Sequence, residues 1–99
     1  MSERTIRQKA AYYLRSLGCK VIALEAGDGW PDILAMPYRH PIFFVEFKSG
    51  RKGHGLQPNQ VSCRHSILGR EQPYALVDKW DDRTKALLLA LCGGGKNEG

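Results

Sequence analysis

Hydrophobic side chains near the start of the chain recur every three or four positions, the spacing that places them on one face of an α-helix. These positions are Ile6, Ala10, Tyr13, Leu14 and Leu17. Ser2 is suited to cap the first turn of this helix, and Gly18 is suited to end it. The pattern therefore predicts an amphipathic helix whose outer face is basic.

Two later segments begin and end as helices do. Proline is favoured in the first turn of a helix, and Pro58 opens a segment that continues to Leu68 and ends at Gly69. Near the C-terminus, Asp81 or Asp82 can cap the segment RTKALLLAL. The sequence thus predicts three helices.

Four short apolar segments are predicted to be β-strands, because they are bounded by turn-forming residues and carry β-branched and aromatic side chains. Their ranges are 19–24, 32–36, 42–48 and 74–77. The turn PYRHP between the second and third segments predicts that these two strands pair antiparallel. The order of helices and strands predicts a mixed α/β domain in which helices flank a central sheet.

The third strand, IFFVEFK, is apolar on both faces before it becomes charged at its end. Alternate side chains of a strand point to opposite faces, so Phe44, Glu46 and Lys48 share one face. A strand that is apolar on both faces is expected at the centre of a sheet, with both sides covered. The charges of Glu46 and Lys48 must then either pair at a hydrated strand end or take part in a functional site.

The chain of 99 residues has the length of one domain, and its formal net charge of +5 favours a polyanion such as nucleic acid. A basic surface that only aids solubility is the alternative. The cysteines Cys19, Cys63 and Cys92 lack the spacing of a zinc site, so we expect reduced thiols and an intracellular, cytoplasmic protein. No segment has the pattern of a signal peptide or a membrane span, so no membrane association is expected.

Asp32 begins the second strand. The start of one antiparallel strand lies beside the end of its partner, so Asp32 is expected next to Glu46 and Lys48. Two converging carboxylates suit a hard divalent cation such as Mg²⁺ or Mn²⁺, which lowers the pKa of a bound water and stabilises charge on a phosphate. Lys48 could orient that water or neutralise the phosphate. This set of residues predicts hydrolysis of a phosphodiester bond.

These residues resemble the PD-(D/E)xK nuclease pattern, with PD at Pro31–Asp32 and EFK at Glu46–Lys48. More closely, the chain resembles the VRR-NUC (virus-type replication-repair nuclease) domain. That domain has a glycine before PD, an E-x-K strand, and a basic or glycine-rich loop that ends in Leu-x-Pro-x-Gln, which is LQPNQ here. The resemblance spans Glu3 to about Val77. It implies an αβββαβ core like that of restriction endonucleases, followed by a C-terminal helix.

The resemblance implies a role for each matching residue. Asp32 and Glu46 would be metal ligands, together with the backbone carbonyl of Phe47. Lys48 would be the catalytic lysine.

Two further residues match the family outside the strands. Gln60 matches a glutamine near the active site, and Glu3 matches an acidic residue of the first helix that would act through metal-bound water. The chain departs from the family at Trp30, where smaller residues are usual. Its side chain could wedge against substrate or fill the core, and we expect it in the core.

Basic residues near the predicted site form the expected DNA-binding surface. They are Arg51, Lys52 and His54 in the glycine-rich loop, Arg64 on the second helix, and Arg4 and Arg7 on the first. Such side chains would contact phosphates, although a solvated flexible loop is the alternative for residues 51–54. No base-reading motif is present, so we expect recognition of DNA shape rather than sequence.

The leading hypothesis is a structure-specific DNA endonuclease that depends on Mg²⁺ or Mn²⁺ and cuts branched DNA such as Holliday junctions. Residues 1–92 would form the nuclease domain, and residues 93–99 a disordered tail. The resemblance and the small core also favour a homodimer. The alternatives are a catalytically silent nucleic-acid-binding module on the same fold, and a structural or interaction domain whose charges only pair.

Overall fold

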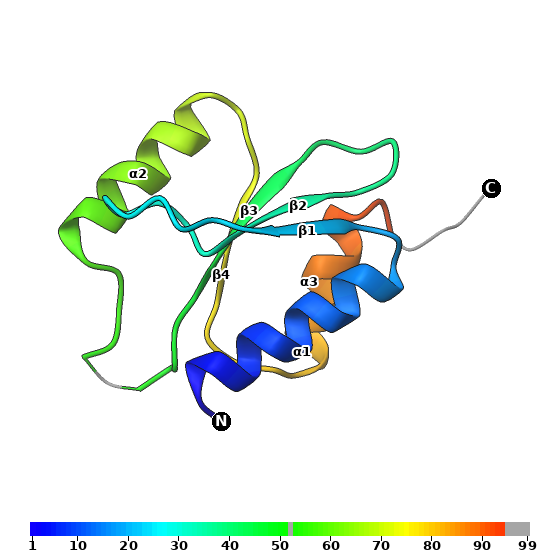
Figure 1. The fold of residues 1–99 in the computed structure, drawn as a ribbon, viewed down its shortest axis with the longest axis horizontal. Coiled ribbons are helices and arrows are strands. Elements are labelled where there is room, and N and C mark those ends of the chain that lie inside the picture. The colour runs from blue at the N-terminus through cyan, green and yellow to red at the C-terminus, as the bar shows by residue number, and fades with distance from the viewer. Residues whose placement is uncertain (52, 95–99) are drawn as a thin grey trace.

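The computed structural model describes residues 1–51 and 53–94 (Figure 1). Its four strands form one sheet in the order β1-β2-β3-β4. The strands are β1 (Lys20–Ala23), β2 (Ile33–Met36), β3 (Phe43–Phe47) and β4 (Tyr74–Val77). β2 pairs antiparallel with both β1 and β3, and β4 is parallel to β3. The predicted mixed α/β fold and the antiparallel β2–β3 pair are confirmed.

The helices are α1 (Glu3–Ser16), α2 (Pro58–Gly69) and α3 (Asp82–Leu91). Ser2 caps α1 by accepting a 3.2 Å hydrogen bond from the backbone N–H of Thr5. Asp81 caps α3 in the same way, accepting a 2.9 Å bond from the backbone N–H of Thr84. In the part of the chain that the structure describes, every helix is too short or too polar to span a membrane.

α3 ends at Leu91, as the segment RTKALLLAL predicted, and a turn at residues 92–94 follows it. The backbone N–H of Gly93 donates to the carbonyl of Ala90, and that of Gly94 donates to the carbonyl of Leu89. Both glycines have positive φ angles, which close the last turn of a helix. Residues 93 and 94 therefore form the turn that follows α3, and the division into a domain of residues 1–92 and a tail of residues 93–99 stays a prediction. Residues 95–99 lie outside the described residues.

One face of the sheet carries the hydrophobic core. The buried side chains of this core are Ile6, Ala10, Leu14, Cys19, Ile33, Ala35, Phe43, Val45, Phe47, Ala75, Val77 and Leu88. α1 and α3 contact each other and lie over this face, whereas α2 lies against the opposite face (Figure 1). Each large apolar side chain buried here contributes about 1.5–3 kcal/mol to folding. This packing fixes α1 against the end of β3.

β3 is central, as predicted, but the face toward α2 is only partly covered. Phe43, Val45 and Phe47 are fully buried in the core, whereas Ile42 is 36% exposed. The expectation that Trp30 fills the core is wrong. Its side chain is 47% exposed and lies against Phe44, with ring centroids 6.1 Å apart. Because α2 covers only part of this face, Trp30 lies outside the core and lines one side of a cleft beside the helix.

Candidate active site

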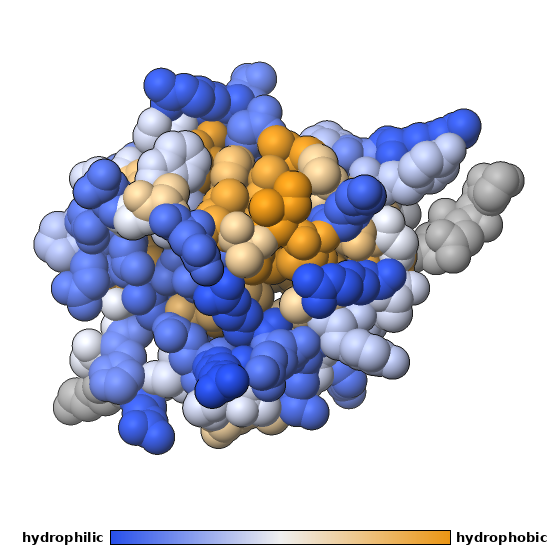
Figure 2. All heavy atoms as spheres, in the orientation of Figure 1, coloured by the Kyte–Doolittle hydropathy of each residue, from blue (hydrophilic) through white to orange (hydrophobic). Residues whose placement is uncertain are grey.

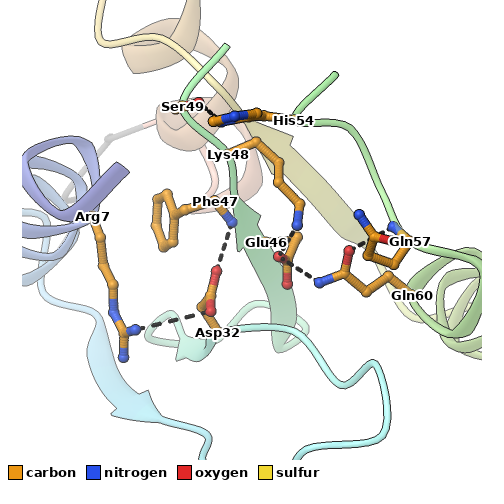
Figure 3. Close-up of polar contacts among 9 residues, drawn as sticks. All are labelled: Arg7, Asp32, Glu46, Phe47, Lys48, Ser49, His54, Gln57 and Gln60. Carbon is orange, nitrogen blue, oxygen red and sulfur yellow. Dashed lines mark hydrogen bonds and ion pairs between the residues drawn. The ribbon is translucent and has the colours of Figure 1, made fainter. Parts of the chain in front are cut away.

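Three segments that are distant in sequence meet at the C-terminal end of β3 (Figure 3). Asp32 immediately precedes β2, Glu46 and Lys48 lie at the end of β3, and Gln60 lies in the first turn of α2. Because β2 and β3 are antiparallel, the start of one lies beside the end of the other. The structure therefore brings together the two acidic residues, the lysine and the glutamine that the sequence singled out.

Asp32 is held by its backbone and its side chain. Its backbone N–H donates to the carbonyl of Val45, and its carbonyl accepts from the N–H of Leu24. Its Oδ2 accepts a 2.8 Å hydrogen bond from the backbone N–H of Phe47. These bonds place the carboxylate at the junction between the two strands. Its side chain is 30% exposed, so Oδ1 faces a partly hydrated space.

Glu46 is the buried member of the pair, with 3% of its surface exposed. Its Oε2 lies 3.4 Å from the Nζ of Lys48 and accepts a 3.2 Å hydrogen bond from the Nε2 of Gln60. Within the described residues, its Oε1 makes no hydrogen bond or ion pair with a side chain. One oxygen of Glu46 is thus fixed by the protein, and the other remains available to a ligand.

Burial and, next, the negative charge of Asp32 raise the pKa of the Glu46 carboxyl from an ordinary value of 4.5 to about 7. Lys48 opposes this change, because its ammonium stabilises the ionised carboxylate. One lysine does not compensate for both burial and a second carboxylate. A divalent cation bound by the two carboxylates would favour their ionised forms and lower this pKa.

Gln60 is oriented by the start of its own helix. Its Oε1 accepts a 2.8 Å hydrogen bond from the backbone N–H of Gln57, at the N-terminus of α2. Because the amide oxygen is occupied, the amide nitrogen must point the other way, toward Glu46 (Figure 3). The positive end of the α2 dipole also favours the ionised form of nearby carboxylates.

The donor set fits a hard divalent cation. Within residues 1–51 and 53–94, no three His, Cys, Asp or Glu side chains gather in a group that could hold a metal ion. Mg²⁺ needs no such group, because it binds through one or two carboxylates and completes its shell with water and phosphate oxygens. Asp32 and Glu46 supply two carboxylates, and the N–H of Phe47 points toward Asp32. The carbonyl of a strand residue lies on the same side as its N–H, so the Phe47 oxygen also faces this space.

Glu3 lies in the first turn of α1, and its side chain is exposed. Its charge slightly raises the pKa of Glu46, so it lies within electrostatic reach of the site. It does not join Asp32 and Glu46 in a three-residue metal-binding group. Its predicted role through a metal-bound water stays a prediction.

Arg7 lies closer to the acidic residues than the sequence suggested. Its Nη1 is 3.9 Å from Oδ1 of Asp32, a loose ion pair between partly exposed side chains. Such a pair contributes little to stability, about 0–1 kcal/mol. The sequence marked Arg7 only as a phosphate contact, because nothing local links position 7 of a helix to the start of a distant strand. Its guanidinium therefore borders the site.

The other predicted DNA-binding residues lie on three different segments of the chain. His54 and Arg51 lie in the loop after β3, where Nδ1 of His54 is 2.8 Å from Oγ of Ser49. Arg64 lies on α2 with its guanidinium 5.5 Å from the centre of the Tyr74 ring. Arg4 is exposed on α1. Lys52 lies outside the described residues.

Sequence reasoning missed the close contact made by Gly29. A Cβ atom at this position would lie 2.3 Å from the backbone oxygen of Asn59, and the residue has a φ of +81°. Only glycine allows the loop before Asp32 to approach the first turn of α2 so closely. This contact sets Gln60 against Glu46. The signal in the sequence was a glycine directly before the Trp-Pro-Asp segment.

A solved structure described as "VRR_NUC domain" is similar to this chain, with a TM-score of 0.72 and 22% sequence identity. The similarity covers 89% of this chain and 94% of the other. No family model matches the sequence, and no curated protein matches it. The resemblance inferred from the motifs is thus confirmed for the fold: the chain has the fold of a VRR_NUC domain.

Proposed function

We propose that this chain, which has the fold of a VRR_NUC domain, is a metal-dependent DNA endonuclease that hydrolyses phosphodiester bonds in branched DNA such as Holliday junctions. The observation that carries this proposal is the convergence of Asp32, Glu46 and Lys48 at the end of β3. Burying a carboxyl next to another carboxyl destabilises a fold, so a purely structural role does not account for it. A bound cation would account for it, because it offsets the charge of both carboxylates.

The protein would hold Mg²⁺ or Mn²⁺ with the carboxylates of Asp32 and Glu46 and the carbonyl of Phe47. When bound, the ion supplies a Lewis acid that lowers the pKa of water and offsets charge on the phosphate. Lys48 holds its ammonium beside Oε2 of Glu46, where it can orient the attacking water or neutralise a phosphate oxygen. Gln60 keeps Glu46 in one orientation. We expect products with 5′-phosphate and 3′-hydroxyl ends.

Cationic side chains around the site would hold the DNA backbone. The loop after β3 carries Arg51 and His54, and α2 carries Arg64. The helix α1 carries Arg4 and Arg7. Glu3 would contact the ion through water. These contacts carry no base information, so the geometry of the DNA would decide where it is cut.

We also propose that two copies associate. Large apolar side chains remain exposed around the partly covered face of the sheet, including Ile22, Trp30 and Ile42. Figure 2 shows hydrophobic side chains gathered over the sheet, beside a hydrophilic region over α1. A second copy would cover this apolar surface and present two sites to two strands. Light scattering should then give a mass twice the 11.1 kDa of one chain.

Cleavage assays test the enzyme directly. Purified protein is incubated with a labelled four-way junction and with linear duplex of the same sequence, with Mn²⁺ or with chelator. We expect junction cleavage only with the metal, and a loss of at least about 100-fold in Lys48→Ala, the range that a positioned acid–base group supplies. Lys20→Ala is the matched control, because Lys20 is exposed and pairs with Met36 at the end of β2 opposite Asp32. Cleavage that persists in Lys48→Ala or in chelator would refute the mechanism.

The same proteins and DNA substrates also test the alternative, that the chain is a catalytically silent nucleic-acid-binding module. Such a module would bind the junction with a steep salt dependence and would not cut it under any metal condition. Calorimetry adds a separate readout, because Mn²⁺ should bind the wild-type protein and fail to bind Asp32→Asn or Glu46→Gln. Metal binding without cleavage would leave the silent module as the better interpretation.

A further inference from the structure

The outer face of α1 carries two adjoining grooves, and the proposed DNA contacts include only two of their lining residues, Arg4 and Arg7. One groove has a volume of about 600 Å³ and is lined by Arg4, Arg7, Gln8, Ala11, Tyr12 and Arg15. The other has a volume of about 440 Å³ and is lined by Gln8, Lys9, Tyr12, Tyr13, Trp80 and Lys85. Gln8 and Tyr12 line both grooves. Tyr12 is therefore the ridge between them.

Every charged residue that lines either groove is a cation. Three arginines line the first groove and two lysines line the second, and neither lining contains a carboxylate. Tyr12 stands among these cations with 78% of its surface exposed. A helix that only needs a solvated outer face does not require an aromatic ring there. The combination of cations and a free ring suits a ligand that carries both phosphates and flat bases.

The cations of the first groove follow the helix axis. Arg7 lies three positions after Arg4 and Arg15 lies eleven positions after it, so the three arginines lie along one side of α1. At 1.5 Å per residue, this row is about 16 Å long. The row passes the candidate active site at Arg7, whose Nη1 is 3.9 Å from Oδ1 of Asp32. A strand held along the row would therefore pass beside the acidic residues.

We propose that α1 binds an unpaired nucleic-acid strand, whose bases stack on Tyr12 while Arg4 and Arg15 contact its phosphates. A base within a duplex is already stacked on its neighbours, so an exposed tyrosine adds affinity only where a base is free. An acidic peptide would also be attracted by the cations, but it has no base to place on the ring. The inference extends the proposed nuclease function by naming the part of a branched substrate, its unpaired strand, that this face holds.

Binding can be measured without cleavage. In chelator, fluorescence anisotropy follows the full-length protein with a labelled oligothymidine of about 15 nucleotides, and with a hairpin duplex of similar length. Tyr12→Ala should weaken binding of the single strand about 10-fold, within the range for loss of one stacked base, and Tyr12→Phe should retain it. Tyr38→Ala is the matched control, because Tyr38 is 75% exposed in the turn between β2 and β3. It should bind as the wild type does.

The salt dependence of binding separates the contribution of the arginine charges from that of the Tyr12 ring. Arg15→Ala should reduce the slope of log affinity against log salt by about 0.7, the value for one phosphate contact on a single strand. Tyr12→Ala should leave that slope unchanged. Arg83→Ala is the matched control, because Arg83 lines a different groove together with Asp78 and Asp81.

The outcomes distinguish this inference from the enzyme assignment. Single-strand binding that falls in Tyr12→Ala supports the inference, whether or not the protein cuts DNA. Unchanged binding in Tyr12→Ala, or an equal loss for the single strand and the duplex, would overturn it. Cleavage in the junction assay bears on the proposed function, whereas the anisotropy of Tyr12→Ala in chelator bears on α1, so failure of one leaves the other standing.

Discussion

Replacing Glu46 with glutamine removes a carboxyl group that is 3% exposed and lies beside a second carboxyl. Its pKa in the folded protein is about 7, against an ordinary value of 4.5. The folded state therefore holds this proton more tightly than the unfolded state does. The free energy of unfolding of the wild type should fall as the pH rises through this window, and glutamine should abolish that contribution.

The size of the effect follows from the change in pKa. A difference of about 2.5 pKa units, from 4.5 to about 7, corresponds to about 3.4 kcal/mol when the carboxyl is fully ionised in both states. About 0.8 kcal/mol of this is already present at about pH 5, where the unfolded chain is partly ionised. Relative to the wild type, Glu46→Gln should therefore gain about 2.5 kcal/mol of stability between about pH 5 and about pH 8.

Urea unfolding at both pH values, in chelator, measures this difference. Because the wild type and the variant share every other titrating group, their difference isolates Glu46. Glu71→Gln is the control, since Glu71 is exposed in the turn before β4. It should show no pH-dependent gain. A Glu46→Gln variant whose stability relative to wild type does not change with pH would refute the reasoning.

Added metal should reverse the order of stability. Mn²⁺ binds the ionised carboxylates of the wild type and should stabilise it in proportion to its concentration. Glu46→Gln lacks one of these ligands and should gain little. Equal stabilisation of both proteins by Mn²⁺ would place the metal elsewhere.

Two further substitutions or treatments test contacts outside the carboxylate pair. Gly29→Ala should destabilise the protein by at least about 1 kcal/mol more than Gly27→Ala and should reduce cleavage, because only the Cβ added at position 29 meets the backbone beside Gln60. Urea unfolding measures the loss of stability, and the junction assay measures the loss of cleavage. Equal effects of the two substitutions would contradict this reasoning. The thiols of Cys19 and Cys92 lie 2.9 Å apart, so oxidation by diamide should join them into a disulfide and raise the melting temperature. Cys19→Ser should abolish that rise, and a rise that persists would refute the pairing.

Several features of the fold followed from local patterns. Helical spacing and capping residues marked α1, and Ser2 does cap it. Turn-forming residues separated the strands, and the short turn before β3 required an antiparallel pair. That pairing alone predicted that Asp32 would lie beside Glu46. These features depend on residues close together in the chain, so the sequence contains enough information for them.

Other features depended on packing between distant segments. Trp30 was expected in the core, but α2 leaves part of the sheet uncovered, and the ring stays 47% exposed. The ion pair between Arg7 and Asp32 required the packing of α1 beside the start of β2. The orientation of the Gln60 amide required the start of α2 to meet the end of β3.

The sequence by itself determined the order of helices and strands and the chemical groups available at the end of β3. Only the tertiary structure decided that Glu46 is buried with a raised pKa while Asp32 stays partly hydrated. It also decided that a cationic row on α1 passes these groups. The physical reason is that periodicity, caps and turns act within a few residues, whereas burial, charge coupling and surface shape arise from contacts between segments far apart in the chain.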